Sequence, residues 1–430
     1  MVEFKKIALR NGLRIVLIPR PQSLASNVLI LVEAGSEYET KKINGLSHFL
    51  EHLMFKGTTK RPMPGMIAEE LASLGAQSNA FTGEEYTGYW AKAESHKLPK
   101  ILDIVSDLYL NPIFNPDEIE KERGVIIEEI NMYEDTPARR VQELFTSLIY
   151  GDQPAGWDIA GQKEVIRKLT RDDFLSYRNT HYVASKTLVV VAGNMNEKKT
   201  LAEIKNSFGG LKRLPRVQKK KTVHKKQVMP EIFLKFKESD QSHFVLGVKA
   251  FDIFDTRRYA LQVLADVLGG GMSSRLFKRV REEMGAAYYV NSSADFYIDH
   301  GHFVVSAGVD HTKVHEVLKA VLLELSRLKD ERISEKELQK SKDHLIGNLI
   351  LGLETSDELA SFYGGQEILT GSVVTPAQLI KKVRAVTAHE LQTLAKLLFW
   401  KKQLNLAIIG PYKDKEAFNK IFKLSAAALH

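Results

Sequence analysis

The chain repeats one arrangement of secondary structure in its two halves. Residues 114–119 open a predicted helix in the first half, and residues 333–338 open a matching helix in the second. Further upstream, residues 50–57 (LEHLMFKG) align with residues 264–271 (LADVLGGG). A single supersecondary plan that recurs along a chain indicates duplication. The repeat therefore predicts two domains of the same fold.

The boundary between the domains is marked by charge. A chain of 430 residues is too long for one hydrophobic core. Its 61 basic and 53 acidic residues give a net charge of +8, and the whole excess lies between Lys212 and Lys226. We expect a solvated basic linker at 212–230 between domains at 1–211 and 231–430, with contact to a polyanion or a membrane surface as the alternative.

The pattern of strands favours an α+β fold. Strand-like runs in both halves alternate apolar and polar residues and are separated by segments of helical period. They occur at 13–18, 27–33, 187–193, 243–249, 301–309 and 403–409. Such alternation indicates a sheet with helices on one face more than a doubly wound parallel sheet. We predict two similar domains, each a mostly antiparallel sheet covered by helices.

Composition limits the location and the metal chemistry. No apolar run is long enough to span a bilayer. The N-terminus enters a strand-like segment at once and resembles neither a signal peptide nor a transit peptide. We therefore expect a cytoplasmic protein, although a chain from which a leader had been removed would look the same. Because the sequence contains no cysteine, any metal must be bound by His, Asp or Glu.

A metal-binding pattern lies in the predicted helix 45–55. His48 and His52 are one turn apart, so both imidazoles project to the same side, with Glu51 beside them. Two imidazoles at this spacing suit Zn²⁺, which takes His nitrogen at about 2.0–2.1 Å in a tetrahedral site. The carboxylate of Glu51 is placed to accept a proton from zinc-bound water, whose pKa lies near about 7.

Chance is the competing explanation of this pattern. We estimate about one chance in fifty for a His-x-x-Glu-His match in a chain of this composition. Burying these side chains without partners would cost several kcal/mol, which a metal would offset. In the second half of the repeat, the corresponding residues are Gln262, Ala265 and Asp266. The shared fold therefore does not require the His/Glu set.

A third ligand is expected from the predicted helix that residues 114–119 open and that ends near Thr136. Glu122 and Glu129 are two turns apart and share a face, so that one can bind the metal while the other braces a histidine. Spacing alone does not choose between Glu128 and Glu129, and the pairing with Glu122 favours Glu129. Taken alone, these glutamates would more often form a solvated face.

These motifs resemble the inverted zincins, the family of pitrilysin, insulysin and mitochondrial processing peptidase. The H-x-x-E-H order of 48–52 is followed by a glutamate 77 residues after His52. The length is similar to that of the two-domain subunits of the processing-peptidase branch. Agreement extends along the chain through residues 11–13, 34–36, 45–58, 79–89, 122–129, 192–194 and 273–288.

The resemblance implies a role for each residue of the metal site. His48, His52 and Glu129 match the zinc ligands, with one Zn²⁺ per chain. Glu51 matches the general base, and Glu122 matches the further glutamate that supports the site.

The resemblance also implies where the substrate binds. Asn79, Ala80 and Phe81 match an edge strand that pairs with the backbone of the peptide substrate. Arg281 and Tyr288 match a pair in the second half that contacts the substrate and stabilises the tetrahedral intermediate. Taken by themselves, Arg281 and Tyr288 would be ordinary surface or core residues.

We therefore expect a zinc endopeptidase that cleaves short or unfolded peptides in a closed chamber. The resemblance implies a homodimer in which Arg281 and Tyr288 reach the zinc of the other subunit, with a paralogous partner as the alternative. A non-catalytic scaffold subunit of the same fold is the second hypothesis. Nucleic-acid binding through 212–226 ranks last, because no aromatic residues are interleaved with these basic residues.

Overall fold

The computed structural model describes residues 3–214, 219–224 and 226–424, and these form two compact units. Unit 1 comprises residues 1–131, 158–221 and 350–374. Unit 2 comprises residues 132–157, 222–349 and 375–430. Each unit contains one sheet, as the internal repeat predicts. No helix in the described part of the chain is long and apolar enough to cross a membrane.

The sheet of unit 1 has six strands and is mostly antiparallel. Its order is β1 (Lys5–Ala8), β2 (Arg14–Pro19), β6 (Thr187–Gly193), β3 (Ala25–Val32), β5 (Thr87–Glu94) and β4 (Gln77–Thr82). Only β2 and β6 pair in parallel. All residues of the central strand β6 are buried, whereas β4 forms an edge and is largely exposed. The edge strand is therefore the accessible part of this sheet.

The sheet of unit 2 repeats this plan with five strands. Its order is β7 (Glu231–Phe236), β11 (Asn405–Gly410), β8 (Gln241–Lys249), β10 (Gly301–Asp310) and β9 (Ala287–Phe296). Only β7 and β11 pair in parallel. Two related, mostly antiparallel sheets with helices confirm the predicted α+β class.

Helices cover both sheets. Those of unit 1 include α1 (Leu46–Leu53), α2 (Met66–Ser73), α3 (Leu98–Leu110), α6 (Lys163–Ile166), α7 (Arg171–His181), α8 (Glu197–Phe208) and α12 (Ser356–Thr370). Those of unit 2 include α5 (Pro137–Tyr150), α9 (Arg258–Gly269), α10 (Val314–Asp330), α13 (Pro376–Ala385), α14 (Ala388–Leu398) and α15 (Glu416–Leu424). The ends of α4 (Pro116–Asp135) and α11 (Glu335–Leu351) extend across the unit boundaries.

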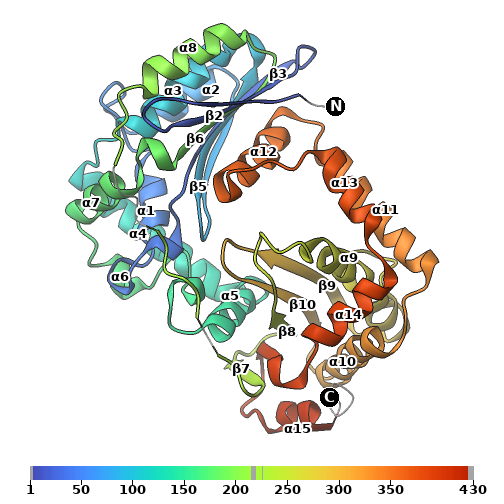
Figure 1. Cartoon of the computed structure of the whole chain (residues 1–430). Coiled ribbons are helices and arrows are strands. Elements are labelled where there is room, and N and C mark those ends of the chain that lie inside the picture. Colours follow the sequence, from blue (N-terminus) through green and yellow to red (C-terminus); the bar gives the residue numbers. More distant parts are fainter. Residues whose placement is uncertain (1–2, 215–218, 225, 425–430) are drawn as a thin grey trace. The chain divides into compact units, whose positions relative to one another are not determined.

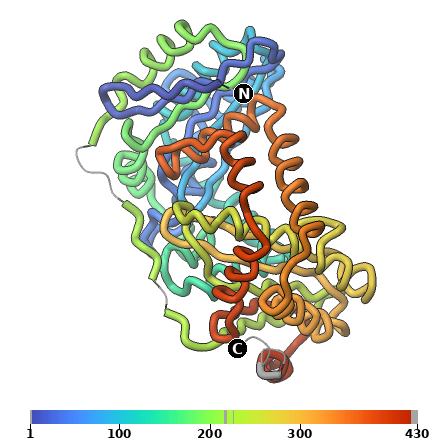
Figure 2. Tube along the Cα trace, turned by 45° about the vertical axis from the view of Figure 1, so that its right-hand side comes forward, coloured from blue at the N-terminus to red at the C-terminus, as the bar shows by residue number. Residues whose placement is uncertain are grey.

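The two halves of the sequence exchange one helix each. The helix α12, from the second half, packs on β3 and β6 of unit 1 (Figure 1). Leu359 and Tyr363 are buried in this contact. The helix α5, from the first half, packs on β8 and β11 of unit 2, where Phe145 is buried. Figure 2 shows the course of the backbone through both exchanged helices. The compact units therefore differ from the predicted domains 1–211 and 231–430. An amphipathic helix shows which of its faces is buried but not which sheet covers it.

The exchanged helices also give each sheet a second covered face. In β3, Leu29 and Leu31 pack with α12, and the alternate residues Val28 and Ile30 are equally buried. Successive strand residues point to opposite faces, so both faces are covered. The prediction of helices on one face only was therefore wrong.

The predicted basic linker is not wholly solvated. Lys220 forms ion pairs with Glu37 and, at 2.7 Å, with Glu85, and its side chain is only 6% exposed. All three residues belong to unit 1. Arg216 and Lys225, which contribute to the predicted charge run, lie outside the described residues. At least one of the eight basic residues therefore contributes to a buried ion pair instead of a solvated surface.

Candidate metal centre

The start of α1 is fixed by a buried carboxylate. Glu39 accepts hydrogen bonds from the backbone N–H groups of Ser47 at 2.6 Å and Gly45 at 2.8 Å. Gly45 has φ of 93°, and a side chain there would collide with the Ala160 carbonyl. Burial raises the pKa of Glu39 to about 7, although these hydrogen bonds act in the opposite direction. The first turn of α1 is therefore fixed by the Glu39 carboxylate and by the close packing of Gly45 against the Ala160 carbonyl.

Buried apolar residues fix the rotation of α1. Leu46, Phe49, Leu50 and Leu53 are at most 1% exposed. Because these residues face the core, the histidines one turn apart share the remaining face, as their spacing predicts. The ring centroids of His48 and His52 are 4.8 Å apart.

The side chains of the three predicted ligands converge, so that their ligand atoms lie close together. Nε2 of His48 and Nε2 of His52 each lie 3.5 Å from Oε2 of Glu129 on α4. The three residues offer ligand atoms that all lie within 4.8 Å of one another. Two ligands bound at about 2.0–2.1 Å in a tetrahedral site lie about 3.3 Å apart. The spacing of these residues therefore fits a zinc ion.

The structure distinguishes between the two neighbouring glutamates. Glu128 is exposed, and its carboxylate accepts a hydrogen bond from Asn131. Glu129 instead turns toward the two imidazoles. The geometry thus favours Glu129, as its pairing with Glu122 suggested.

Glu122 bridges His52 and a lysine. Its Oε1 lies 2.9 Å from Nδ1 of His52, and its Oε2 lies 2.5 Å from Nζ of Lys56. Burial tends to raise the pKa of Glu122, but the hydrogen bonds with His52 and Lys56 lower it overall. A carboxylate at Nδ1 assigns the ring proton to that atom and directs the lone pair of Nε2 toward a metal.

Glu51 lies beside the ligands and contacts the edge strand. Thr82 at the end of β4 donates a hydrogen bond of 2.6 Å to Oε2 of Glu51. Burial raises the pKa of Glu51, and the hydrogen bond from Thr82 partly offsets this effect. An ionisable group with a raised pKa beside a candidate metal site is suited to proton transfer.

The residues expected to bind the substrate backbone lie on β4. Asn79, Ala80 and Phe81 pair with β5 on one side only, which leaves β4 as an edge among the described strands. Asn79 is exposed and Phe81 is 36% exposed. An exposed edge offers backbone donors and acceptors to an extended peptide.

Arg281 and Tyr288 lie in unit 2, on the π-helical segment η6 (Phe277–Glu283) and on β9. Nη1 of Arg281 donates a hydrogen bond of 2.9 Å to the carbonyl of Tyr288. The side chain of Tyr288 is exposed to solvent, with 61% of the residue accessible. The two residues are thus adjacent to each other, and their predicted role toward the substrate stays a prediction.

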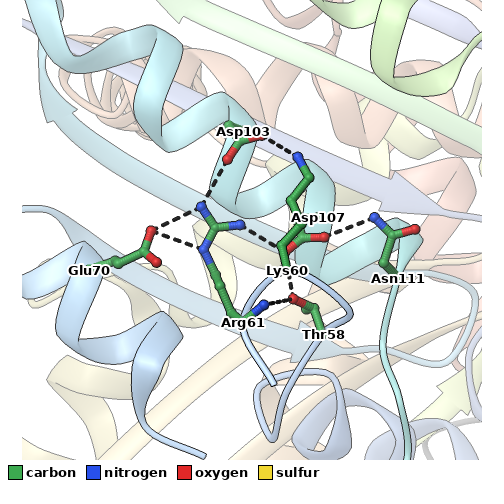
Figure 3. Close-up of polar contacts among 7 residues, drawn as sticks. All are labelled: Thr58, Lys60, Arg61, Glu70, Asp103, Asp107 and Asn111. Atoms are coloured by element: carbon green, nitrogen blue, oxygen red, sulfur yellow. Dashed lines mark hydrogen bonds and ion pairs between the residues drawn. The ribbon is translucent and has the colours of Figure 1, made fainter. Parts of the chain in front are cut away.

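A polar network that sequence reasoning missed fixes the position of residues 58–61, which follow α1. Arg61 donates to Asp107 and Asp103 at 2.8 Å each and to Glu70 at 2.9 Å (Figure 3). Thr58 donates to Asp107 at 2.5 Å. The network connects this segment to α2 and α3. Its members are separated by up to 49 residues, so no local spacing indicates it.

Lys56 and Thr82 are the contacts of the metal site that sequence reasoning also missed. Lys56 follows His52 by four residues, a spacing that would place both on one side of a continuing helix. That spacing was the available signal for Lys56. No comparable signal exists for Thr82, because its contact with Glu51 depends on how β4 packs beside α1.

Comparisons with known proteins show which family this fold belongs to. Residues 14–163 match the model of the insulinase family (peptidase family M16), and residues 168–345 match that of the peptidase M16 inactive domain. A Bacillus subtilis protein named as an uncharacterized zinc protease is 35% identical over 95% of this chain and 98% of its own. A Streptomyces coelicolor protein with the same description is 33% identical over 96% of this chain and 91% of its own.

Two solved structures show the same fold. A protease from Helicobacter pylori superposes with a TM-score of 0.90 at 24% identity, covering 96% of this chain and 100% of that one. A peptidase M16 inactive domain from Pseudomonas fluorescens gives a TM-score of 0.88 at 16% identity, covering 96% and 99%. Fold and metal-site geometry together define a two-domain protein of the inverted-zincin class. The chain belongs to the insulinase family, peptidase family M16, which confirms the resemblance seen in the sequence.

The second unit carries a different arrangement at the corresponding helices. There, Asp266 on α9 forms an ion pair of 2.6 Å with His344 on α11. Among the described residues of unit 2 taken by itself, no three side chains form a candidate metal cluster. This difference agrees with the description of the second family model as an inactive domain.

Proposed function

We propose that this protein is a zinc-dependent endopeptidase. The observation that carries the proposal is the convergence of His48, His52 and Glu129, whose ligand atoms lie within 4.8 Å of one another. Membership in a peptidase family and relatives named as zinc proteases support it. One zinc ion per chain, when bound, would polarise the scissile carbonyl and make water acidic enough to act as a nucleophile near neutral pH.

Proton transfer is the role of Glu51. Its carboxylate accepts the proton of the attacking water and then returns it to the leaving amine. The hydrogen bond from Thr82 fixes the direction of this carboxylate. Burial raises the pKa of Glu51, which brings its basicity closer to that required at neutral pH.

Glu122 and Lys56 orient His52. The hydrogen bond of Glu122 with Nδ1 keeps Nε2 of His52 available, and Lys56 offsets the charge of Glu122. These residues act on the ligand and not on the substrate.

The substrate is a short or unfolded peptide. We propose that it adds to the exposed edge of β4 at Asn79, Ala80 and Phe81, a mode that recognises backbone more than side chains. In the proposed homodimer, Arg281 and Tyr288 of one subunit contact the substrate bound at the metal site of the other. A closed chamber would exclude folded proteins by size.

A non-catalytic scaffold is the second candidate. The description of residues 168–345 as an inactive domain is the observation in its favour. The complete set of ligand atoms in unit 1 favours catalysis.

Metal analysis combined with one variant tests the proposal. We expect about one zinc per purified chain, and Glu51→Gln should retain that zinc while losing cleavage of an unfolded casein substrate. His48→Ala should lose both. A metal content below about 0.1 zinc per chain would favour the scaffold. Full cleavage by Glu51→Gln would remove Glu51 as the base.

A further inference from the structure

A cavity of about 520 Å³ lies in unit 2. None of the residues that line it belongs to the candidate metal site. The cavity is lined by the first turn of α9, the end of α13 and the first turns of α14, and it is open to solvent. Small-molecule sites in proteins commonly measure about 300–1,000 Å³ and combine an apolar lining with a few polar groups. The size of this cavity therefore suits a small organic ligand.

The floor of the cavity is apolar. Ala260, Val386 and Leu394 line it and are between 4% and 7% exposed. The ring of Tyr259, which is 7% exposed, adjoins them. Apolar surface that remains accessible only through a cavity gains free energy when a ligand covers it.

Two cations meet at one phenol oxygen beside this floor. The hydroxyl of Tyr259 accepts hydrogen bonds from Nη2 of Arg258 at 2.9 Å and Nζ of Lys382 at 3.1 Å. A phenol hydroxyl can accept hydrogen bonds and also donate one, so the hydroxyl proton of Tyr259 is still available for donation. In the part of the chain that the structure describes, no acceptor takes this proton.

Neither cation of this pair forms an ion pair among the described residues. Asp255, the nearest acid in sequence, is engaged in a bidentate pair with Arg257. The pKa of Tyr259 reflects the same surroundings: burial raises it, but the hydrogen bonds from Arg258 and Lys382 lower it overall.

The acid on the rim is also occupied. Glu390 accepts hydrogen bonds from the backbone N–H and the hydroxyl of Thr387 at 2.7 and 2.8 Å, which closes the capping box of α14. Both hydrogen bonds go to Oε2 of Glu390, which ties this side chain to the helix terminus. The cavity thus presents an ammonium group and a phenol proton that no carboxylate of the described residues contacts.

We propose that this cavity binds a small monocarboxylate that carries an apolar chain or ring. One carboxylate oxygen accepts from Lys382 and the other from the hydroxyl of Tyr259, while the apolar part covers Ala260, Val386 and Leu394. Two donors match the two oxygens of a carboxylate, and the apolar floor favours an organic acid over an inorganic anion. This inference is independent of the proposed peptidase activity.

A purely structural contact between α9 and α13 would require neither an open cavity nor an unused phenol proton. The contacts of Tyr259 with Arg258 and Lys382 connect these helices, but an ion pair with a carboxylate between closely packed helices would connect them equally well. The open cavity and the remaining phenol proton are what a ligand site adds.

The test is calorimetric titration of the full-length protein with 4-phenylbutyrate, and with its neutral amide as a second ligand. We expect saturable one-to-one binding of the acid and at least about tenfold weaker binding of the amide. Lys382→Met and Tyr259→Phe should each weaken binding of the acid by about tenfold or more. Lys381→Met is the matched control, because Lys381 is exposed on the same helix and does not line the cavity.

Three results would overturn the proposal. These are no binding of the acid at about 10 mM, equal binding of acid and amide, and equal losses in the Lys381 and Lys382 variants. Thermal unfolding of each variant shows whether it is folded. Lys382 is exposed and Tyr259→Phe keeps the ring, so both variants are expected to fold.

Discussion

Nδ1 of His52 lies 2.9 Å from Oε1 of Glu122, so that a candidate zinc ligand is oriented by a carboxylate from a second helix. Partners of this kind fix the tautomer of a ligating histidine, and their loss commonly weakens metal binding by about 10–100-fold. We expect Glu122→Gln to lower zinc affinity within that range, as measured by competition with a chromogenic chelator. Glu120→Gln, on the exposed side of the same helix, is the control. Equal affinities for both variants would contradict the role of Glu122.

The Arg61 network should stabilise unit 1. Asp107 is fully buried at its side chain, so Arg61→Gln leaves a buried carboxylate without its ionic partner. We expect a loss of about 3 kcal/mol in the free energy of unfolding, measured by urea denaturation. Lys60→Met removes an exposed ion pair with Asp103 and should cost less than about 1 kcal/mol. A similar small loss in both variants would show that the network is not stabilising.

Glu39 should make stability depend on pH. Its pKa is raised by burial from 4.5 to about 7, so the folded chain binds more protons than the unfolded chain between these values. Its contribution to stability is therefore present below pH 4.5 and is lost as pH rises toward 7 and above. We expect the stability of the wild type relative to Glu39→Gln to fall by up to about 3 kcal/mol over this window. Thermal unfolding of metal-free protein at several pH values measures this difference, and a flat or rising difference would contradict it.

Packing of α12 on the sheet should distinguish two adjacent glycines. A Cβ atom at Gly364 would lie 3.0 Å from Leu31 and 3.1 Å from Val190, whereas at Gly365 the nearest atom is 3.7 Å away. Alanine favours a helix over glycine by about 1 kcal/mol. Gly365→Ala should therefore be the more stable of the two alanine variants by about 1 kcal/mol, as shown by urea unfolding. The reverse order would mean that α12 is less closely packed than described.

The sequence predicts that the candidate ligands lie close together because the information for this is local. His48, Glu51 and His52 lie within one turn of α1, and the apolar residues around them fix which way that helix faces. Glu129 follows from its two-turn spacing to Glu122 only once the helix α4 is assumed. The structure adds what depends on distant segments, namely the contact of Thr82 with Glu51 and the bridge from Glu122 to Lys56.

The fold class was also predictable, whereas the division into units was not. Alternation in the strands and the internal repeat indicate two mostly antiparallel sheets. Neither pattern shows that Tyr363 is buried on the first sheet or Phe145 on the second, because both sheets present similar apolar surfaces. Lys220 is a comparable case, since a lysine within a basic run gives no indication that two buried acids surround it.

Because α5 packs on the sheet of unit 2 and α12 on the sheet of unit 1, the chain cannot be cut between its two sequence halves into fragments that each contain a complete core. Fragments cut between residues 211 and 231 would each lack a helix that the other contains and would each expose one sheet face. Expressed singly, such fragments should aggregate, and only joint production should yield material that dissolves. Evolution by swapping one half of the gene for a relative's would meet the same obstacle, because each half must suit the core of the other.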